Sequence, residues 1–228
     1  MIVVRRRMGV IIASTLMVMG VLTPGLLTSS VAAQTMRSDQ VPVTYRVNTN
    51  DPVVFITIDD GITQSDAVAQ VVRRKKLPVT SFLTWNTVRG DNAYFSAVSR
   101  FDSVQNHTLS HPVLTGSGVN VRREICAIQR PMRQAFGARP YMFRPPYGVG
   151  PRDTRIQSAT SSCGIRHIVM WDAVVDRGRL QTWNGSRLSK GSIILLHYTP
   201  NLGADLKVAL AAARAQGLRP APLRDYLR

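Results

Sequence analysis

Apolar segments typical of buried strands alternate along the chain with segments of helical apolar spacing, and this alternation constrains the fold most strongly. VVFITI at 53–58 is typical of a buried strand, 64–76 has the spacing of a helix, and VTSFLT at 79–84 is again typical of a strand. Seven strands separated mostly by helices predict an α/β fold with a parallel sheet, either doubly wound or closed as a (β/α) barrel. The further strands are expected near 102–107, 141–144, 166–171, 192–197 and 218–222.

Two of the helical segments carry signals for their ends. Residues 121–136 have helical spacing but contain Pro131, which predicts an interruption of the helix. Gly217 predicts the end of a helix over 201–217.

The first 33 residues have the layout of a signal peptide. Three arginines at 5–7 precede an apolar stretch from Met8 to about Leu22, a Pro-Gly pair interrupts it, and small residues predict cleavage after Ala33. An uncleaved membrane anchor is the alternative, which the Pro-Gly pair disfavours. We therefore expect a secreted or cell-wall-associated protein without stable membrane insertion after cleavage.

Cleavage would leave 195 of the 228 residues, enough for one domain with a substantial core and too few for two ordinary ones. We expect an N-terminal arm over 34–51, with a short strand at 43–47, and one domain over 52–228. The expected oligomeric state is a monomer.

The chain is strongly basic. Loss of residues 1–33 removes three arginines and no acid, so the formal net charge falls from +16 to +13. Outside a cell such a charge favours contact with anionic cell-wall polymers, although a compositional bias towards arginine is the alternative explanation. The basic residues are scattered and form no nucleic-acid-binding motif, so we expect no nucleic-acid partner.

Cys126 and Cys163 are the only cysteines, and both lie in the part expected to be exported. Because an oxidising location favours disulfides, we expect the two to be bonded. Two buried free thiols are the alternative.

Ionisable residues fall at the ends of the expected strands. A parallel barrel gathers the carboxyl ends of its strands on one face, and buried strands rarely tolerate unpaired charges. The pattern therefore favours a distorted (β/α) barrel over a doubly wound sheet and indicates a functional site. The residues are Asp59 and Asp60 after the first strand, His107 after the third, Arg144 after the fourth, Asp172 after the fifth and His197 after the sixth.

NHTLSHP at 106–112 places His107 and His111 four positions apart. On one helical turn the two rings would share a face and could bind one metal ion, whereas the alternative is two polar residues that cap a helix. A hydrolytic centre of the zinc type needs a third ligand. TIDDG at 57–61 offers Asp59 and Asp60, whose side chains diverge at a strand end, so that one could bind the metal while the other acts as a general base. An ordinary Asp-rich turn is the alternative for this motif alone.

TIDDG, NHTLSHP, FRPPYG and LLHY occur in this order, and the ordered set resembles the polysaccharide deacetylases of carbohydrate esterase family 4 over about residues 53–223. HTLSHP is the most specific of the four motifs. The resemblance implies that Asp59 is the catalytic base and that Asp60, His107 and His111 bind a divalent metal. Zinc is the expected metal and cobalt the alternative.

The other two motifs carry further roles by the same resemblance. Arg144 is similar to the arginine that holds the base, and the backbone N–H of Tyr147 to a donor that stabilises the oxyanion. His197 resembles the general acid. Leu195 resembles part of the pocket for the acetyl methyl group.

One segment departs from the family, whose members carry a D-x-x-D-W element after the fifth strand. Here the chain has WDAVVDRGR at 171–179. With Trp171 as the anchor, Val174 and Gly178 stand where the family has the Asp that tunes the acid histidine and the Trp that walls the acetyl pocket.

Three nearby residues could replace the missing functions. Asp172 or Asp176 could orient His197, and Trp183 could rebuild the pocket wall for the substrate. The resemblance then implies an exported metal-dependent hydrolase that removes N-acetyl groups from a cell-wall glycan, either peptidoglycan or a chitin-type polymer, and releases acetate. An esterase for O-acetyl xylan and a non-catalytic carbohydrate-binding relative are the alternatives, with an amidohydrolase for small amides as a remote third.

The remaining candidates are interpreted as structural. His167 lies in an apolar strand segment and is expected to be a strand residue rather than a fourth ligand. Tyr94 and Phe95 are expected to pack, and Trp85 could either line a sugar subsite or pack in the core.

Overall fold

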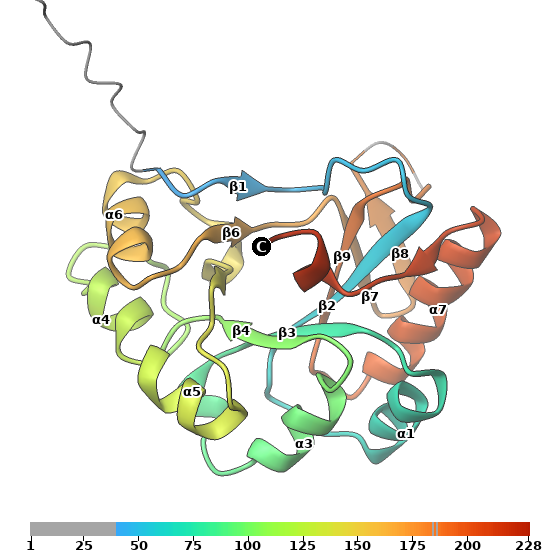
Figure 1. Cartoon of the computed structure of the whole chain (residues 1–228), viewed down its shortest axis with the longest axis horizontal. Helices are drawn as coiled ribbons and strands as arrows, with labels where there is room; N and C mark the ends of the chain where they lie inside the picture. Colours follow the sequence, from blue (N-terminus) through green and yellow to red (C-terminus); the bar gives the residue numbers. More distant parts are fainter. Residues whose placement is uncertain (1–39, 184, 186) are drawn as a thin grey trace, which may run out of the picture. The chain divides into compact units, whose positions relative to one another are not determined.

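One curled sheet of ten strands forms a half-barrel that carries the rest of the fold (Figure 1). Hydrogen-bonded neighbours follow the order β1-β6-β5-β4-β3-β2-β9-β7-β8, and β10 pairs with β2. Neighbouring strands are parallel except for β7 and β8. The strands are β1 (Val43–Thr44), β2 (Val53–Asp60), β3 (Val79–Leu83), β4 (Ser103–Asn106), β5 (Met142–Phe143), β6 (His167–Val169), β7 (Ala173–Asp176), β8 (Arg179–Thr182), β9 (Ser192–His197) and β10 (Arg219–Pro220).

The computed structural model describes residues 40–183, 185 and 187–228, which belong to one compact unit. The expected signal peptide at 1–33 and the beginning of the expected arm lie outside the described residues. The rest of that arm contains β1, which pairs with β6. In the described part of the chain, no helix is both long and apolar enough to cross a membrane.

The helices cover the outside of the curved sheet, and the C-terminus lies within the curve (Figure 1). Two 3-10 turns, η1 (Pro146–Gly148) and η2 (Leu223–Asp225), complete the fold. The α-helices are α1 (Asp66–Lys75), α2 (Trp85–Val88), α3 (Asn92–Val98), α4 (Val121–Cys126), α5 (Gln129–Phe136), α6 (Thr154–Ser162) and α7 (Leu202–Ala215).

The central strand β2 separates the two sides of the sheet. Because side chains alternate along a strand, Val54, Ile56 and Ile58 pack outward in one cluster with residues of α1 and α7. On the inner side Phe55 packs against the C-terminal residues Leu223 and Leu227. The apolar core therefore fills the inside of the half-barrel near the start of β2 and leaves the polar end of the strand for the site.

The seven strands expected from the sequence correspond to β2, β3, β4, β5, β6, β9 and β10, so the predicted distorted barrel is confirmed. Two details differ. The helix expected over 121–136 is two helices that meet at Ala127 and Ile128, and Pro131 lies in the first turn of α5, where its missing N–H is not needed. The antiparallel hairpin β7–β8 was not expected, because its polar residues conceal the strand pattern.

Cys126 and Cys163 form a disulfide between the ends of α4 and α6, with their Cα atoms 5.0 Å apart. This separation is usual for a disulfide. The expected pairing of the two cysteines is therefore present in the structure.

Candidate metal and acyl-transfer site

The two acids that end β2 point to different partners. Asp59 Oδ1 accepts a hydrogen bond from Arg144 at 2.7 Å, whereas Asp60 Oδ1 lies beside the two histidine rings. Asp60 has a φ of 79° and Gly61 a φ of 94°, so the chain turns sharply at the strand end. A Cβ at Gly61 would also lie 2.3 Å from Val88 Cγ1, so only glycine fits there. The predicted divergence of the acids is confirmed.

The two histidines converge through a loop and not through a helix. His107 follows β4 directly, and neither it nor His111 belongs to a helix. Thr108 and His111 have positive φ values of 74° and 61°. The backbone N–H of Thr108 donates to Asn106 Oδ1, and that of His111 donates to Thr108 Oγ1, both at 2.9 Å. The prediction of a helical turn, and with it that of a helix cap, is therefore wrong.

Helix α4 supports this loop from behind. Glu124 accepts hydrogen bonds from the backbone N–H and the hydroxyl of Ser110 at 2.9 and 3.0 Å, and its carbonyl accepts one from the N–H of Leu109 at 2.9 Å. Asn106 Nδ2 donates to the carbonyl of Ile125 at 2.9 Å. Since the disulfide joins the end of α4 to α6, the histidine loop is held by a covalently tethered helix.

The three expected ligand atoms form a nearly equilateral triangle. Asp60 Oδ1 lies 3.3 Å from His107 Nε2 and 3.1 Å from His111 Nε2, and the two nitrogens are 3.2 Å apart. A tetrahedral ion bound at about 2.0–2.1 Å holds its ligands about 3.3 Å from one another. The triangle therefore matches one face of such a tetrahedron, and the donor set suits zinc.

The hydrogen bonds around the triangle also indicate a cation. His107 Nδ1 lies 2.8 Å from the carbonyl oxygen of Arg144, which can only accept, so Nδ1 must carry the proton. In the neutral ring, Nε2 then presents a lone pair towards Asp60 Oδ1. This carboxylate oxygen is buried and accepts no hydrogen bond from the described residues. Two acceptors this close repel each other unless a positive charge lies between them.

Electrostatics at the triangle favour the ionised acid. Burial raises the pKa of Asp60, but hydrogen bonds and charge from the His107 and His111 rings in their protonated form outweigh that effect and hold the pKa well below its usual range, as a cation bound between neutral rings would also do. The carboxylate is thus available as a metal ligand at any ordinary pH.

Arg144 is fully buried and connects three strands. Its guanidinium donates to Asp59, to Thr57 Oγ1 at 2.9 Å, and to the carbonyls of Val169 and Met170, each at 2.9 Å. Burial lowers the pKa of Arg144, and the charge of Asp59 partly offsets this. The arginine therefore fixes Oδ1 of Asp59 and leaves Oδ2, which lies 3.8 Å from His107 Nε2, facing the metal ligands.

The RPPYG loop presents a backbone donor beside the histidines. Tyr147 has a φ of 58°, and its ring packs edge-on against His111 with centroids 4.7 Å apart. Its N–H makes no hydrogen bond to any group in the described part of the chain. Of the six non-glycine residues with positive φ among the described residues, four lie at this site, namely Asp60, Thr108, His111 and Tyr147. Such concentrated backbone strain is typical of functional sites.

His197 and Leu195 lie on β9, directly beside β2. His197 is in register with Asp59, and Leu195 with Thr57, so all four side chains emerge on the inner face of the sheet. On the other side Leu195 is in register with Val174 of β7. Val174 therefore occupies the inner face two positions below His197, where the family pattern has an acid.

The departing segment forms the β7–β8 hairpin. Arg177 and Gly178 have φ values of 49° and 74°, which suit a tight two-residue turn, and the N–H of Gly178 donates to Asp205 of α7. A large side chain such as the family's Trp is disfavoured at this left-handed position. The hairpin thus replaces both residues that the family pattern leads one to expect.

The acids of this segment do not contact His197 in the structure. Asp172 accepts hydrogen bonds from the N–H of Ile193 and the hydroxyl of Ser192, at the opposite end of β9, so the expectation that it orients His197 is wrong. Asp176 is exposed and lies 3.8 Å from Arg177. No side-chain hydrogen bond to the His197 ring occurs among the residues that the structure describes.

Trp183 is also placed away from the metal ligands. It follows β8, its N–H donates to the carbonyl of Asp172, and its ring contacts Tyr45. In the register of the hairpin it lies about 10 Å or more along the strands from His197. The prediction that Trp183 walls the acetyl pocket is therefore wrong.

Besides Tyr147, the aromatic residue Trp171 reaches the site. The guanidinium of Arg144 lies 5.6 Å from its ring centroid, and a Cβ at Gly148 would be 2.6 Å from its Cη2 atom. From the sequence, Trp171 is recognised only as the anchor of the D-x-x-D-W comparison. Its place at the end of the expected strand at 166–171, near the carboxyl ends that carry the site acids, is the signal that could have found it.

The residues assigned to packing behave as expected. His167 of β6 contacts the carbonyl of Arg228 at 3.2 Å and takes no part in the metal site. Phe95 is buried and packs with Tyr94 and Tyr198. Trp85, for which both a sugar subsite and core packing were open, is partly buried against the same core.

Comparisons with known proteins agree with this geometry. The family model described as "Polysaccharide deacetylase" matches residues 46–168. A protein of Streptomyces coelicolor, described as uncharacterized, is 41% identical and aligns over 82% of this chain and 77% of its own. A bifunctional xylanase/xylan deacetylase of Cellvibrio japonicus is 33% identical over 73% of this chain but only 26% of its own length. A chitooligosaccharide deacetylase of Sinorhizobium fredii is 28% identical over 70% of this chain and 78% of its own.

Solved structures share the fold. A family 4 carbohydrate esterase from Bacillus anthracis has a TM-score of 0.65 at 23% identity and covers 81% of this chain and 86% of its own. The family 4 esterase of Streptomyces lividans, solved with acetate, has a TM-score of 0.60 at 26% identity over 77% and 93%. A family 4 pseudoenzyme from Bacillus anthracis scores 0.65 at 19% identity over 82% and 69%. The motifs, the half-barrel and the family match together establish that the chain belongs to the polysaccharide deacetylases of carbohydrate esterase family 4.

Proposed function

We propose that the protein is an exported, metal-dependent hydrolase that removes N-acetyl groups from a cell-wall glycan built on N-acetylglucosamine. The observation that carries the proposal is the triangle of Asp60, His107 and His111, with edges of 3.1–3.3 Å, beside an acid that Arg144 holds by one oxygen. A divalent ion on these ligands, zinc or alternatively cobalt, would supply a Lewis acid that polarises an acetyl carbonyl and acidifies a water.

Proton transfer would fall to Asp59 and His197. Asp59 Oδ2 faces the ligands and is not used by Arg144, so it can take a proton from the attacking water as general base. His197 stands in register with Asp59 on the neighbouring strand and is partly exposed, so it can give a proton to the leaving nitrogen. The N–H of Tyr147 can donate to the developing oxyanion.

The surroundings of the site suit a sugar chain. Four apolar side chains on the site loops are exposed: Ile62 after the β2 turn, Val113 after His111, and Tyr147 and Val149 in the RPPYG segment. Apolar side chains of this kind can pack against the faces of pyranose rings. Leu195 lies on the inner face below His197, in a position to contact the acetyl methyl group.

Two observations support export and the wall as the place of action. Residues 1–33 have the composition of a signal peptide, and the Cys126–Cys163 disulfide is of the kind that persists in oxidising compartments. The net charge favours contact with anionic wall polymers.

Hydrolysis of O-acetyl esters on xylan is the second candidate, and the similarity to the xylan deacetylase of Cellvibrio japonicus favours it. Both activities use the same base and metal ligands. The two reactions differ in the leaving group, which is an alcohol for the ester and an amine for the amide. Because an alcohol needs less protonation to leave than an amine does, the ester reaction should depend less on His197.

Acetate release tests the proposal directly. The purified protein is stripped of metal, reloaded with zinc or cobalt, and assayed on N-acetylglucosamine oligomers, peptidoglycan and acetylated xylan. Asp59→Asn removes the base while keeping its shape, and His167→Ala is the matched control for a histidine outside the site. We expect metal-dependent release from the amide substrates, reduced at least about hundredfold by Asp59→Asn and unchanged by His167→Ala.

The other outcomes discriminate between the alternatives. Release from acetylated xylan alone would establish the ester activity. Release from none of the polymers, with one metal ion bound per chain, would reject the deacetylase in favour of a carbohydrate-binding protein in which the β7–β8 hairpin has removed catalysis. Release from small amides alone would indicate a non-sugar substrate.

A further inference from the structure

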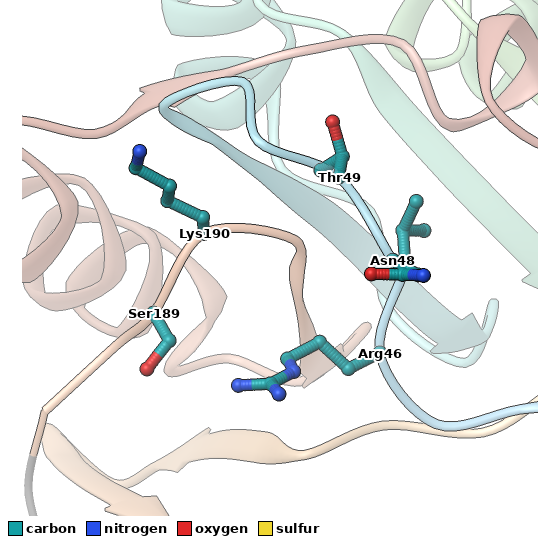
Figure 2. Close-up of a pocket in the computed structure, with 6 residues that line it drawn as sticks. Arg46, Asn48, Thr49, Ser189 and Lys190 are labelled. Atoms are coloured by element: carbon teal, nitrogen blue, oxygen red, sulfur yellow. The ribbon is translucent and has the colours of Figure 1, made fainter.

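Two adjoining hollows form a groove beside the beginning of β9. The first has a volume of about 510 Å³ and is lined by Arg46, Val47, Asn48, Thr49, Ser189 and Lys190 (Figure 2). The second, of about 180 Å³, shares Arg46 and Ser189 with it and adds Tyr45, Asp172, Thr182, Trp183 and Arg187. We call the two together the Trp183 groove.

The Trp183 groove lies at the other end of the sheet from the metal ligands. Lys190 comes two residues before β9, and Arg46 forms a bridge with Ser192, the first residue of that strand. His197 is the last residue of the same strand, about 16 Å further along. The groove is therefore not an extension of the catalytic site.

The groove carries positive charge that the described residues neutralise only in part. Arg46 and Lys190 are exposed, and neither forms an ion pair within the described part of the chain. Figure 2 shows the Arg46 guanidinium extending towards Ser189, which belongs to a different segment. The Arg187 guanidinium binds the neutral Gln216 side chain at 2.9 and 3.1 Å and keeps its charge. The groove thus offers several unused N–H donors to an anion.

Asp172, the single acidic residue that lines the groove, already accepts hydrogen bonds from the protein. Asp172 Oδ1 accepts from the N–H of Ile193 at 2.8 Å, and Oδ2 accepts from the hydroxyl of Ser192 at 3.0 Å. Its charge reduces the local potential without blocking Arg46. A ligand with single, spaced negative charges suits such a groove better than one with dense charge.

An exposed indole lies beside these cations. Trp183 is 63% exposed, although its ring is held against Tyr45 with the centroids 5.0 Å apart. Among the described residues the other large, exposed apolar side chains are Ile62, Val113, Tyr147 and Val149, all on the loops of the metal site. Trp183 is thus the exception, and a large, fixed apolar ring at the surface is typical of a binding site.

We propose that the Trp183 groove binds a polysaccharide whose sugars carry carboxylates. The face of a sugar ring would pack on Trp183, and its carboxylate would pair with Arg46 and Lys190, since a guanidinium matches a carboxylate in geometry. This binding is independent of the proposed deacetylation and would hold the protein on an anionic polymer. An aromatic ring next to unpaired cations is the combination that such a ligand requires.

Binding of the full-length protein to polygalacturonate tests the inference, with highly methyl-esterified polygalacturonate as the matched neutral polymer and polyphosphate as the anion without sugar. The variants are Trp183→Ala and the double change Arg46→Gln and Lys190→Gln. The control is Arg73→Gln with Arg100→Gln, which removes the same charge from a separate hollow between α1 and α3. Thermal unfolding and acetate release from a short soluble substrate show that each variant is folded and active.

We expect polygalacturonate to bind and esterification to abolish most of the affinity. Trp183→Ala should weaken binding about tenfold, and the Arg46/Lys190 double variant should weaken it and reduce its dependence on salt. Equal effects of the control pair, or no effect of Trp183→Ala, would show diffuse adsorption to a basic surface and overturn the proposal. Tighter binding of polyphosphate than of polygalacturonate would also overturn it, since the sugar ring would then contribute nothing.

Discussion

His107 Nδ1 donates a hydrogen bond to the backbone carbonyl of Arg144 at 2.8 Å, which ties a proposed metal ligand to the residue that holds the proposed base, Asp59. The Arg144 side chain reaches Asp59 at 2.7 Å, so one residue orients both the ring of His107 and the carboxylate of Asp59. In the proposed reaction, the metal ligand His107 and the base Asp59 would therefore depend on the same residue at the end of β5.

Replacing Arg144 with Met should destabilise the protein by about 3–5 kcal/mol, because it leaves the buried Asp59 carboxylate unpaired. Urea denaturation measures this free energy. The matched control is Arg155→Met, which breaks the exposed pair with Asp153 and should cost under about 1 kcal/mol. Equal costs for the two changes would show that the buried pair has no special role in stability.

Loss of either of the two half-buried ligands of the triangle, Asp60 or His111, should release the metal. Asp60→Asn and His111→Ala should reduce the bound zinc from about one ion per chain to under about 0.1 after dialysis, because two remaining ligands do not hold the ion. Elemental analysis of the dialysed protein gives this ratio. His167→Ala should retain the full amount, and retention of zinc by both ligand variants would exclude the triangle as the metal site.

Removing the disulfide should weaken both stability and metal binding. Cys126→Ser with Cys163→Ser opens a closed loop with a separation of 37 residues and should cost about 2–4 kcal/mol of unfolding free energy. Because α4 holds the histidine loop through Glu124, the zinc affinity should also fall, by about tenfold. Competition with a chelator measures the affinity. A variant that loses stability but keeps its zinc affinity would show that the loop does not depend on the tether.

Introducing an acid into the hairpin should restore a partner for His197. Val174→Asp places a carboxylate on the inner face, in register with Leu195 and two positions below His197. A nearby negative charge favours the protonated ring, so the alkaline limb of the pH–rate profile should move to higher pH. Val174→Asn is the neutral control of the same shape. Identical pH–rate profiles for the two variants would mean that the introduced carboxylate does not interact with His197.

The buried acid Asp102 should make stability depend on pH. Burial raises the pKa of Asp102 above its usual range, although hydrogen bonds from Thr80 and from the backbone N–H of Leu223 oppose this. The folded state therefore holds the proton to higher pH than the unfolded state, and this contribution to the unfolding free energy falls as pH rises from about 4 towards the raised pKa.

Asp102→Asn should remove that decline. Urea denaturation at about pH 4 and about pH 7 compares the variant with the native protein, and the cost of the substitution should be smaller at the higher pH. Asp176→Asn, at an exposed acid, is the control for removal of one charge. A cost that is larger at about pH 7 would contradict the direction of the pKa shift.

Much of the fold could be predicted because local sequence and local structure agree. The apolar segment at 53–58 is buried on both faces in β2, and such strands have a continuous apolar pattern that is easily recognised. Gly217 has a φ of 68° just after α7, as expected of a residue that ends a helix. The polar residues after the strands were sufficient to predict Asp59, Asp60, His107 and Arg144 as one site, because parallel strands bring their ends together.

Other features depended on contacts that no local pattern encodes. His107 and His111 converge through the positive φ angles of a loop held by α4, although their spacing indicated a helical turn. Asp172 and Trp183 lie near Val174 in the sequence, but the β7–β8 hairpin places them towards the other end of the sheet from His197.

The order of the motifs, the donor types and the strand ends were thus determined by the sequence alone, since each rests on residue identity and short-range periodicity. The tertiary structure decided which residues meet, because strand register moves a side chain by about 3.3 Å per residue and a tight turn reverses its direction. Trp183 is an example of this distinction. The family resemblance left it as a candidate wall of the acetyl pocket, whereas the register of β7, β8 and β9 places it beside Tyr45 and Arg46 in a separate basic groove.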